Sequence, residues 1–324
     1  MKDSVFKNLL VNLRALFTTN IRRSINQISA KQESIEKTSD QLKISMAEKD
    51  HFLNILDYFD HHEDEARKFI KEIDYLHRHW SYCNFPYDPD TQFSDVVSGY
   101  DETSKMPYVI HKNKKLFFPS TFSVEKSVSV YLNYVQVEKL LGRGDDEGTP
   151  HQYQSPAIQV SEGDVVFDIG AAEGLFALDH VEKASHIFIV ESDPRWITPL
   201  RKTFAPYGDK VTIIQKFIST VDTPNTLSLR KLLSEVDYSS AFVKMDIEGY
   251  ELPAIASAED VLKEKQGIKI AAAAYHRQHD AEELKMIFEH LGYTSEFSNG
   301  YMLFRLYDNP QPPFFRKGMI RAMK

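Results

Sequence analysis

The feature that most constrains the fold is an alternation of short apolar runs and helical patterns from Ile158 onward. The runs are almost continuously apolar, which is typical of strands buried on both faces of a parallel sheet. They cover residues 165–169, 187–190, 211–214, 242–245 and 268–274. Helical patterns fill the gaps, at 175–183, 195–204, 226–233, 252–265 and 281–291. This series predicts a doubly wound α/β sheet with helices on both faces.

The end of this region departs from the series. Residues 294–297 and 301–306 flank Ser298-Asn299-Gly300, a turn signal of β-hairpins. We therefore expect the sheet to finish in an antiparallel hairpin, within an α/β domain at residues 155–308. Residues 309–324 contain prolines and basic residues, and we expect them to form a loose basic tail.

The chain before this domain divides in two. Residues 1–80 contain no glycine or proline and predict a helical N-terminal arm, whose first helix is amphipathic and basic. Three interpretations stay open for the arm: packing on the catalytic domain, a coiled coil with another copy in a homo-oligomer, or contact with an anionic membrane surface. Residues 81–154 predict a small α+β lid on the substrate side, with a hairpin around 112–115 and a helix over 124–141.

Composition narrows the functional classes. The formal net charge of −8 argues against nucleic-acid binding, which needs a basic face. Cys83 is the only cysteine, so no internal disulfide can form, and a cytoplasmic location fits. No apolar run approaches the ~20 residues of a membrane-spanning helix. The arm leaves a membrane-peripheral location open.

The first strand leads into a turn of small residues, Asp168-Ile169-Gly170-Ala171-Ala172-Glu173-Gly174. Small side chains let a ligand approach the backbone at the carboxyl end of a strand. We expect Gly170, Ala171 and Gly174 to border a nucleotide there, and Asp168 to accept hydrogen bonds from a cationic amino group. A dinucleotide dehydrogenase would instead show G-x-G-x-x-G, without an acid that repels the pyrophosphate.

The second and third strands supply the other end of the nucleotide site. Glu191 ends the second strand, where a carboxylate can accept hydrogen bonds from both ribose hydroxyls. Ser192 lies beside it. Adenine is then expected near the loop after the third strand, at Phe217 and Ile218. Capping of the next helix is the alternative role for Glu191.

Residues 241–251 resemble the fourth-strand segment of the FkbM family of methyltransferases, which reads lysine-apolar-Asp-apolar-Glu-Gly-x-Glu. The turn that begins at Asp168 and the segment Glu191-x-Asp193-Pro194 stand in the family's order, so the resemblance covers about residues 148–306. It implies a class I, Rossmann-like methyltransferase fold and S-adenosylmethionine as cofactor. It also implies methylation of a hydroxyl on a sugar, glycan or secondary metabolite, as in polysaccharide biosynthesis. Ala172 departs from the family, which commonly has Asn there.

Two side chains are candidates for the chemistry. Asp246 ends the fourth strand and could act as the base or orient the acceptor hydroxyl; its alternative role is a hydrogen bond to the cofactor or to the local backbone. His276 follows the fifth strand at the same edge and can exchange protons near neutral pH. Together with Glu248 they could also hold Mg²⁺, although no metal site is assigned. A NAD-dependent oxidoreductase and a catalytically inactive binding module remain the alternatives.

Overall fold

The computed structural model describes residue 46 and residues 49–80, 83–89, 96–142, 149–304 and 311–324. The described residues form two compact units, one made of those up to His62 with Trp80, the other of 63–79 and those from Cys83 on. In the first unit, residues 49–61 are helical. The basic amphipathic helix predicted around 6–21 lies outside the described residues.

The second unit begins with three short helical segments: α2 (Glu63–Ala66), η1 (Arg67–Phe69) and α3 (Ile70–His79). The ring of Phe69 contacts the rings of Tyr301 and Phe315, at centroid distances of 4.7 and 4.9 Å. These residues therefore pack with the C-terminal part of the chain. Among the helices of the described residues, none is long and apolar enough to cross a membrane.

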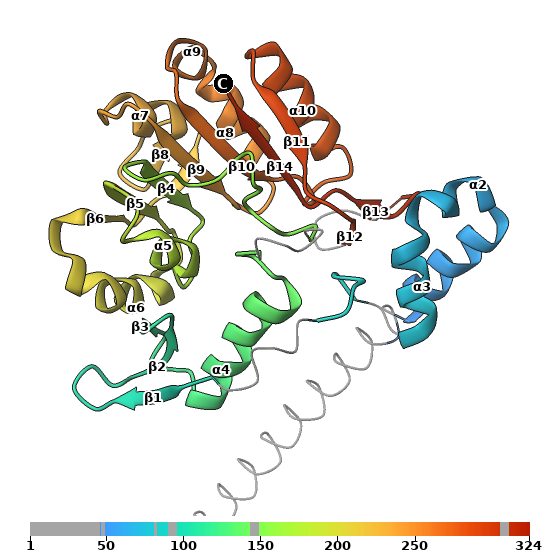
Figure 1. Ribbon diagram of the computed structural model, residues 1–324, viewed down its shortest axis with the longest axis horizontal. Coiled ribbons are helices and arrows are strands. Elements are labelled where there is room, and N and C mark those ends of the chain that lie inside the picture. Colours follow the sequence, from blue (N-terminus) through green and yellow to red (C-terminus); the bar gives the residue numbers. More distant parts are fainter. Residues whose placement is uncertain (1–45, 47–48, 81–82, 90–95, 143–148, 305–310) are drawn as a thin grey trace, which may run out of the picture. The chain divides into compact units, whose positions relative to one another are not determined.

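A seven-stranded sheet forms the centre of the second unit, in the order β11-β14-β10-β9-β4-β5-β6 (Figure 1). Its five parallel strands confirm the predicted ones. The central strands β4 and β9 are buried at every residue and so read as continuously apolar, whereas β6 at the edge is only partly buried. The chain begins the sheet at the central strand β4, adds β5 and β6 on one side, and then adds β9 and β10 on the other. The carboxyl ends of β4, β5 and β9 therefore lie at the switch point where such sheets bind ligands. The bounds are β4 (Val165–Ile169), β5 (His186–Val190), β6 (Val211–Ile214), β9 (Ala241–Met245) and β10 (Ile268–Ala273).

The hairpin predicted between residues 294–297 and 301–306 is wrong, because the first of these strands pairs with a different one. Strand β11 (Thr294–Phe297) pairs antiparallel with β14 (Met319–Met323), and β14 also pairs antiparallel with β10. Residues 302–303 form β12 (Met302–Leu303), which pairs with β13 (Phe315–Arg316) in a separate small sheet. The mixed sheet nevertheless has the antiparallel finish expected from the sequence.

The predicted loose tail is also wrong, because its last residues form β14 inside the sheet. Met319, Ile320 and Ala322 are fully buried there. Arg321 and the other basic residues of 309–324 favoured the prediction of an exposed tail. Its guanidinium is instead buried, donating a hydrogen bond to the Gln154 carbonyl at 2.7 Å and pairing with Glu296 at 3.1 Å.

Helices cover both faces of the sheet, and each face has its own apolar core. Two predicted helices are divided. The 252–265 pattern breaks at Ala258, and the 226–233 pattern begins as β8 (Thr226–Ser228), which pairs with β7 (Phe217–Ser219). One face carries α5 (Leu175–His180) and α6 (Pro194–Phe204), and the other carries α7 (Leu229–Ser234), α8 (Glu251–Ser257), α9 (Glu259–Glu264) and α10 (Asp280–His290).

The predicted lid region holds β1 (Ser98–Asp101) and the predicted hairpin, formed by β2 (Met106–His111) and β3 (Lys114–Phe117). His111 is buried and lies 2.8 Å from Asp179, so this sheet is tied to the end of α5. The helix predicted over 124–141 is shorter: α4 (Val124–Leu132) continues as a π-helical turn, η3 (Asn133–Val137). Such widened turns frequently lie at functional sites.

Candidate functional site

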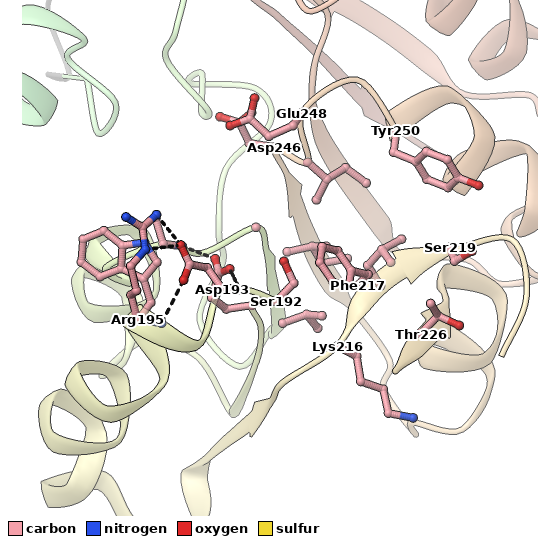
Figure 2. Close-up of a pocket in the computed structure, with 18 residues that line it drawn as sticks. Ser192, Asp193, Arg195, Lys216, Phe217, Ser219, Thr226, Asp246, Glu248 and Tyr250 are labelled. Carbon is pink, nitrogen blue, oxygen red and sulfur yellow. Dashed lines mark hydrogen bonds and ion pairs between the residues drawn. The ribbon is translucent and has the colours of Figure 1, made fainter. Parts of the chain in front are cut away.

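Two adjoining cavities open at the carboxyl ends of β4, β5 and β9. The larger has a volume of about 660 Å³ and lies between the turn that follows β4 (residues 170–174, the β4 turn), the end of β5 and β7 (Figure 2). The smaller, of about 260 Å³, lies between the β4 turn, η3 and the segment before β4. Both are bordered by Gly170, Ala172, Asp246 and Glu248. The β4 turn and the end of β9 therefore separate the two compartments and belong to both.

Gly170 makes this arrangement sterically feasible. Its φ of +71° lies in the left-handed region, and a Cβ built on it would lie 1.9 Å from the carbonyl oxygen of Asp246. Only glycine fits there, so the ends of β4 and β9 approach more closely than side chains would allow. Ala172 also has a positive φ, of 48°. The Asn common in the family at this position tolerates that conformation better than alanine does.

The larger cavity contains most residues predicted to bind the nucleotide. Glu191, Ser192, Phe217 and Ile218 line it together with Gly170. Glu191 is buried, and its two oxygens accept hydrogen bonds from the backbone N–H groups of Ala172 at 2.8 Å and Asp193 at 2.7 Å. The β4 turn is thereby fixed to the end of β5. Phe217 borders the cavity, as Figure 2 shows, with 62% of its surface exposed.

Asp168 is not among the residues that line either cavity. Its side chain is fully buried: one oxygen accepts a hydrogen bond from the N–H of Ala177 at 3.1 Å, and the other lies 3.2 Å from Lys244 Nζ. Lys244 also donates to the Gly170 carbonyl at 2.6 Å. Burial alone would lower the pKa of Lys244, but the neighbouring carboxylates, first Asp168, raise it. The pair thus stabilises the turn beneath the cavities.

Ala171 lines only the smaller cavity, and Gly174 lines neither. Gly174 is instead the N-cap of α5, with a φ of +82°. A Cβ built there would lie 2.7 Å from Leu200 Cδ2, so this glycine permits α5 to pack closely on α6. Its observed role is packing, and the contact with a nucleotide predicted for it stays a prediction.

Asp246 is surrounded by hydrogen-bonding groups from several segments. Tyr153 donates to Oδ2 at 3.1 Å, Tyr275 donates to Oδ1 at 3.2 Å, and His151 Nε2 lies 3.1 Å from Oδ2. Burial alone would raise the pKa of Asp246, but the hydrogen bond and charge of His151, with the charges of His276 and Lys244, lower it well below its usual range. The carboxylate is therefore ionised throughout the neutral range.

His151 lies between two carboxylates in the wall of the smaller cavity. Its Nδ1 is 2.8 Å from Glu138, the residue that follows η3, and its Nε2 faces Asp246. Burial would lower the pKa of His151, but its hydrogen bonds to Asp246 and Glu138 raise it to about 9. The sequence did not single out His151, Glu138 or Tyr153, because none of them belongs to a strand of the α/β series.

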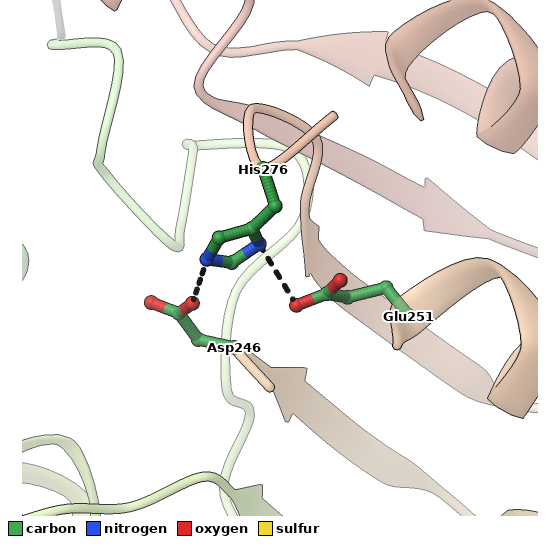
Figure 3. Close-up of side chains that lie close together, drawn as sticks. All are labelled: Asp246, Glu251 and His276. Carbon is green, nitrogen blue, oxygen red and sulfur yellow. Dashed lines mark ion pairs between the residues drawn. The ribbon is translucent and has the colours of Figure 1, made fainter. Parts of the chain in front are cut away.

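His276 is positioned behind Asp246 rather than in a cavity. It is 1% exposed, and its nitrogens face Asp246 at 3.5 Å and Glu251 at 3.2 Å (Figure 3). Burial would lower the pKa of His276, but Glu251 and Asp246 raise it. The catalytic role predicted for His276 stays a prediction, and its burial favours positioning of Asp246.

Asp246, Glu251 and His276 also form a cluster whose ligand atoms lie within 4.8 Å of one another. The imidazole stands between the carboxylates, so its two nitrogens point to different oxygens and do not converge on one point (Figure 3). A protonated imidazole would also repel a cation. The geometry thus favours a carboxylate–imidazole–carboxylate chain over the Mg²⁺ site considered from the sequence.

The described residues fit S-adenosylmethionine. The larger cavity supplies a buried carboxylate at the tip of β5, an exposed aromatic ring on β7 and a turn with no room for a side chain at Gly170. A seven-stranded sheet of this order, with an antiparallel strand between its last two parallel ones and a ligand site at the switch point, defines a class I methyltransferase fold.

Residues 148–295 match the family model for the methyltransferase FkbM domain, and this part of the chain is an FkbM methyltransferase domain.

Solved structures of methyltransferases resemble the chain at low identity. A precorrin-6y C5,15-methyltransferase from Geobacter metallireducens GS-15 is 19% identical, with a TM-score of 0.36, over 52% of this chain and 82% of that protein. An S-adenosylmethionine-dependent O-methyltransferase from Thermotoga maritima is 19% identical, with a TM-score of 0.34, over 52% of this chain and 62% of that protein. No curated protein matches the chain.

Proposed function

We propose that the protein transfers a methyl group from S-adenosylmethionine to a hydroxyl oxygen of a sugar, a glycan or a secondary metabolite. The observation that carries the proposal is the position of Asp246. It lines both cavities, so one carboxylate borders a nucleotide-sized compartment and a second, aromatic compartment. A methyl donor and a methyl acceptor must meet at such a junction.

S-adenosylmethionine supplies an electrophilic methyl group on a sulfonium. In this chain Glu191 would hold the ribose hydroxyls, and Phe217 with Ile218 would border the adenine. Gly170 and Ala172 would offer backbone contact near the methionine part. The methyl group would then lie toward Asp246, which is the residue common to both compartments.

The smaller cavity suits a hydroxylated acceptor. Aromatic rings give a sugar ring apolar faces to pack on, and carboxylates and an imidazole accept or donate hydrogen bonds to its hydroxyls. Five of the lining residues come from the lid region, outside the part that matches the family model. Acceptor choice would thus depend on residues particular to this chain. The lining rings are Phe85, Tyr134, Tyr153, Phe176, Tyr275 and Phe304.

Asp246 and His151 divide the work on the acceptor in this proposal. The ionised Asp246 accepts a hydrogen bond from the acceptor hydroxyl and orients its oxygen toward the methyl group. Neutral His151, 3.1 Å from Asp246, takes up the proton that the hydroxyl loses. Glu138 stabilises the imidazolium that results.

The test is transfer of a labelled methyl group to a panel of neutral sugars, amino sugars, glycans and phenols, with products identified by mass spectrometry. We expect a product heavier by one methyl substituent on oxygen. Methylation of nitrogen or carbon would contradict the hydroxyl assignment. Tight binding of S-adenosylhomocysteine without turnover on any acceptor would favour the inactive binding module.

Glu191→Ala is expected to weaken S-adenosylhomocysteine binding by about 10–100-fold, because the carboxylate that would accept charge-assisted hydrogen bonds from the two ribose hydroxyls is lost. Calorimetric titration measures the effect. Glu182→Ala is the matched control, since that glutamate is exposed and borders neither cavity. An unchanged Kd for Glu191→Ala would show that this carboxylate only caps the turn and the following helix.

Turnover should rise with pH toward about 9, because neutral His151 is the proton acceptor and its pKa is raised to about 9. Below that pKa the neutral fraction grows about tenfold per pH unit, and kcat at saturating acceptor should follow. The measurement is kcat from about pH 6 to about pH 10. His151→Gln should lose this rise, whereas His290→Gln, at an exposed histidine, should keep it. A flat or falling profile in the unaltered protein would exclude His151 as the acceptor.

A further inference from the structure

We propose that Glu173 binds the α-ammonium group of the methionine part of S-adenosylmethionine, the role that the sequence suggested for Asp168, and that Glu173 releases its proton when the cofactor binds. This inference rests on the proposed function, because it concerns how the same cofactor is held. It assigns a residue of the β4 turn to the ammonium group and predicts that the affinity for the cofactor depends on pH.

Asp168 is not placed to do this. Its carboxylate has no exposed surface and lines neither cavity, and both of its oxygens are engaged, by the N–H of Ala177 and by Lys244. Reaching a ligand would require breaking a buried ion pair, which leaves an uncompensated buried charge. The cationic end of the cofactor therefore needs another carboxylate.

Glu173 is placed to do it. It belongs to the same turn, directly after Ala172, which borders both cavities, and it lines the smaller cavity together with Gly170 and Ala171. Its residue surface is only 4% exposed, so water satisfies little of its charge. In the structure its Oε1 accepts a long hydrogen bond, 3.4 Å, from the N–H of Leu175, and its other hydrogen bonds are to its own backbone and to the neutral hydroxyl of Tyr134. An ammonium group in the cavity would give the buried carboxylate a short, charged partner.

The surroundings of Glu173 explain why a proton is involved. Lys244 on β9 lowers the pKa of the carboxyl, and Asp168 on β4 raises it. Tyr134 in η3 also faces it. Burial is the largest cause and raises the pKa of Glu173 to about 8, so the acid is mostly protonated at neutral pH. A bound cation favours the charged form, and the proton must then leave to solvent.

The test is calorimetric titration of the full-length protein with S-adenosylhomocysteine in two buffers of different ionisation enthalpy. At about pH 7 the difference between the binding enthalpies measured in the two buffers should correspond to release of nearly one proton. The release should fall toward zero as the pH rises above about 9. 5′-Methylthioadenosine, which lacks the amino-acid part, should bind without release. Glu173→Gln should bind S-adenosylhomocysteine about 10–100-fold more weakly, without release, and should bind 5′-methylthioadenosine unchanged.

The outcomes separate this inference from the proposed function. Glu182→Gln is the matched control at an exposed glutamate and should behave as the unaltered protein does. Tight S-adenosylhomocysteine binding with no proton release, or with Glu173→Gln unaffected, would overturn the role of Glu173 and leave the methyltransferase proposal standing. Absence of binding by the unaltered protein would overturn both.

Discussion

Asp246→Asn should lower kcat by about 10²–10⁴-fold and leave the Kd for S-adenosylhomocysteine within about threefold. The amide keeps the shape of the side chain but loses the charge that orients the acceptor hydroxyl. It also removes one of the two carboxylates that face His151 in the smaller cavity. In the proposed arrangement Glu191 and Phe217 hold the cofactor's ribose and adenine, away from Asp246, so affinity for the product should survive.

The measurement pairs methyl-transfer kinetics with calorimetric titration on the same preparation. Asp209→Asn, at an exposed aspartate that lines neither cavity, controls for the substitution itself. Thermal unfolding should confirm that the Asp246→Asn protein is folded. Loss of turnover and cofactor affinity in equal measure would show that Asp246 binds the cofactor and does not act on the acceptor.

Ile320→Ala should lower the free energy of unfolding by about 2–5 kcal/mol. Ile320 is fully buried in β14, between β10 and β11, where removing methyl groups leaves a cavity that the sheet cannot close. This is a large part of the 5–15 kcal/mol typical of a whole domain. A loose tail, as the sequence suggested, would tolerate the change.

Denaturant unfolding of the full-length protein measures this effect. Met323→Ala is the matched control, because Met323 belongs to the same strand but is 39% exposed. Its cost should stay near the ±0.5 kcal/mol of ordinary surface positions. Equal, small costs at both positions would contradict the placement of β14 in the sheet.

The sequence predicted the parallel strands well because burial on both faces leaves an almost unbroken apolar run, as in β4 and β9. It failed at β14, where Arg321 and the preceding prolines resemble an exposed tail. Arginine is tolerated there only because backbone carbonyls and Glu296 satisfy its guanidinium. Those partners are distant in sequence, so no local pattern could reveal them.

The site was predictable where it lies at strand ends. Glu191 and Asp246 each follow a strand directly, and both line the larger cavity as expected. Asp168 also ends a strand, but its side chain turns into the protein toward Lys244, which is a matter of tertiary pairing. Glu138 lies near the end of the helix predicted over 124–141 and His151 in the segment before the first strand, so neither marks a strand end, and only the fold brings them to Asp246.

The central claim is that the larger cavity, at the carboxyl ends of β4, β5 and β9, holds S-adenosylmethionine. The most direct measurement is calorimetric titration with S-adenosylhomocysteine and, separately, with NAD. The account predicts saturable binding of S-adenosylhomocysteine, weakened by Glu191→Ala, and no binding of NAD. Binding of NAD with no response to S-adenosylhomocysteine would contradict it.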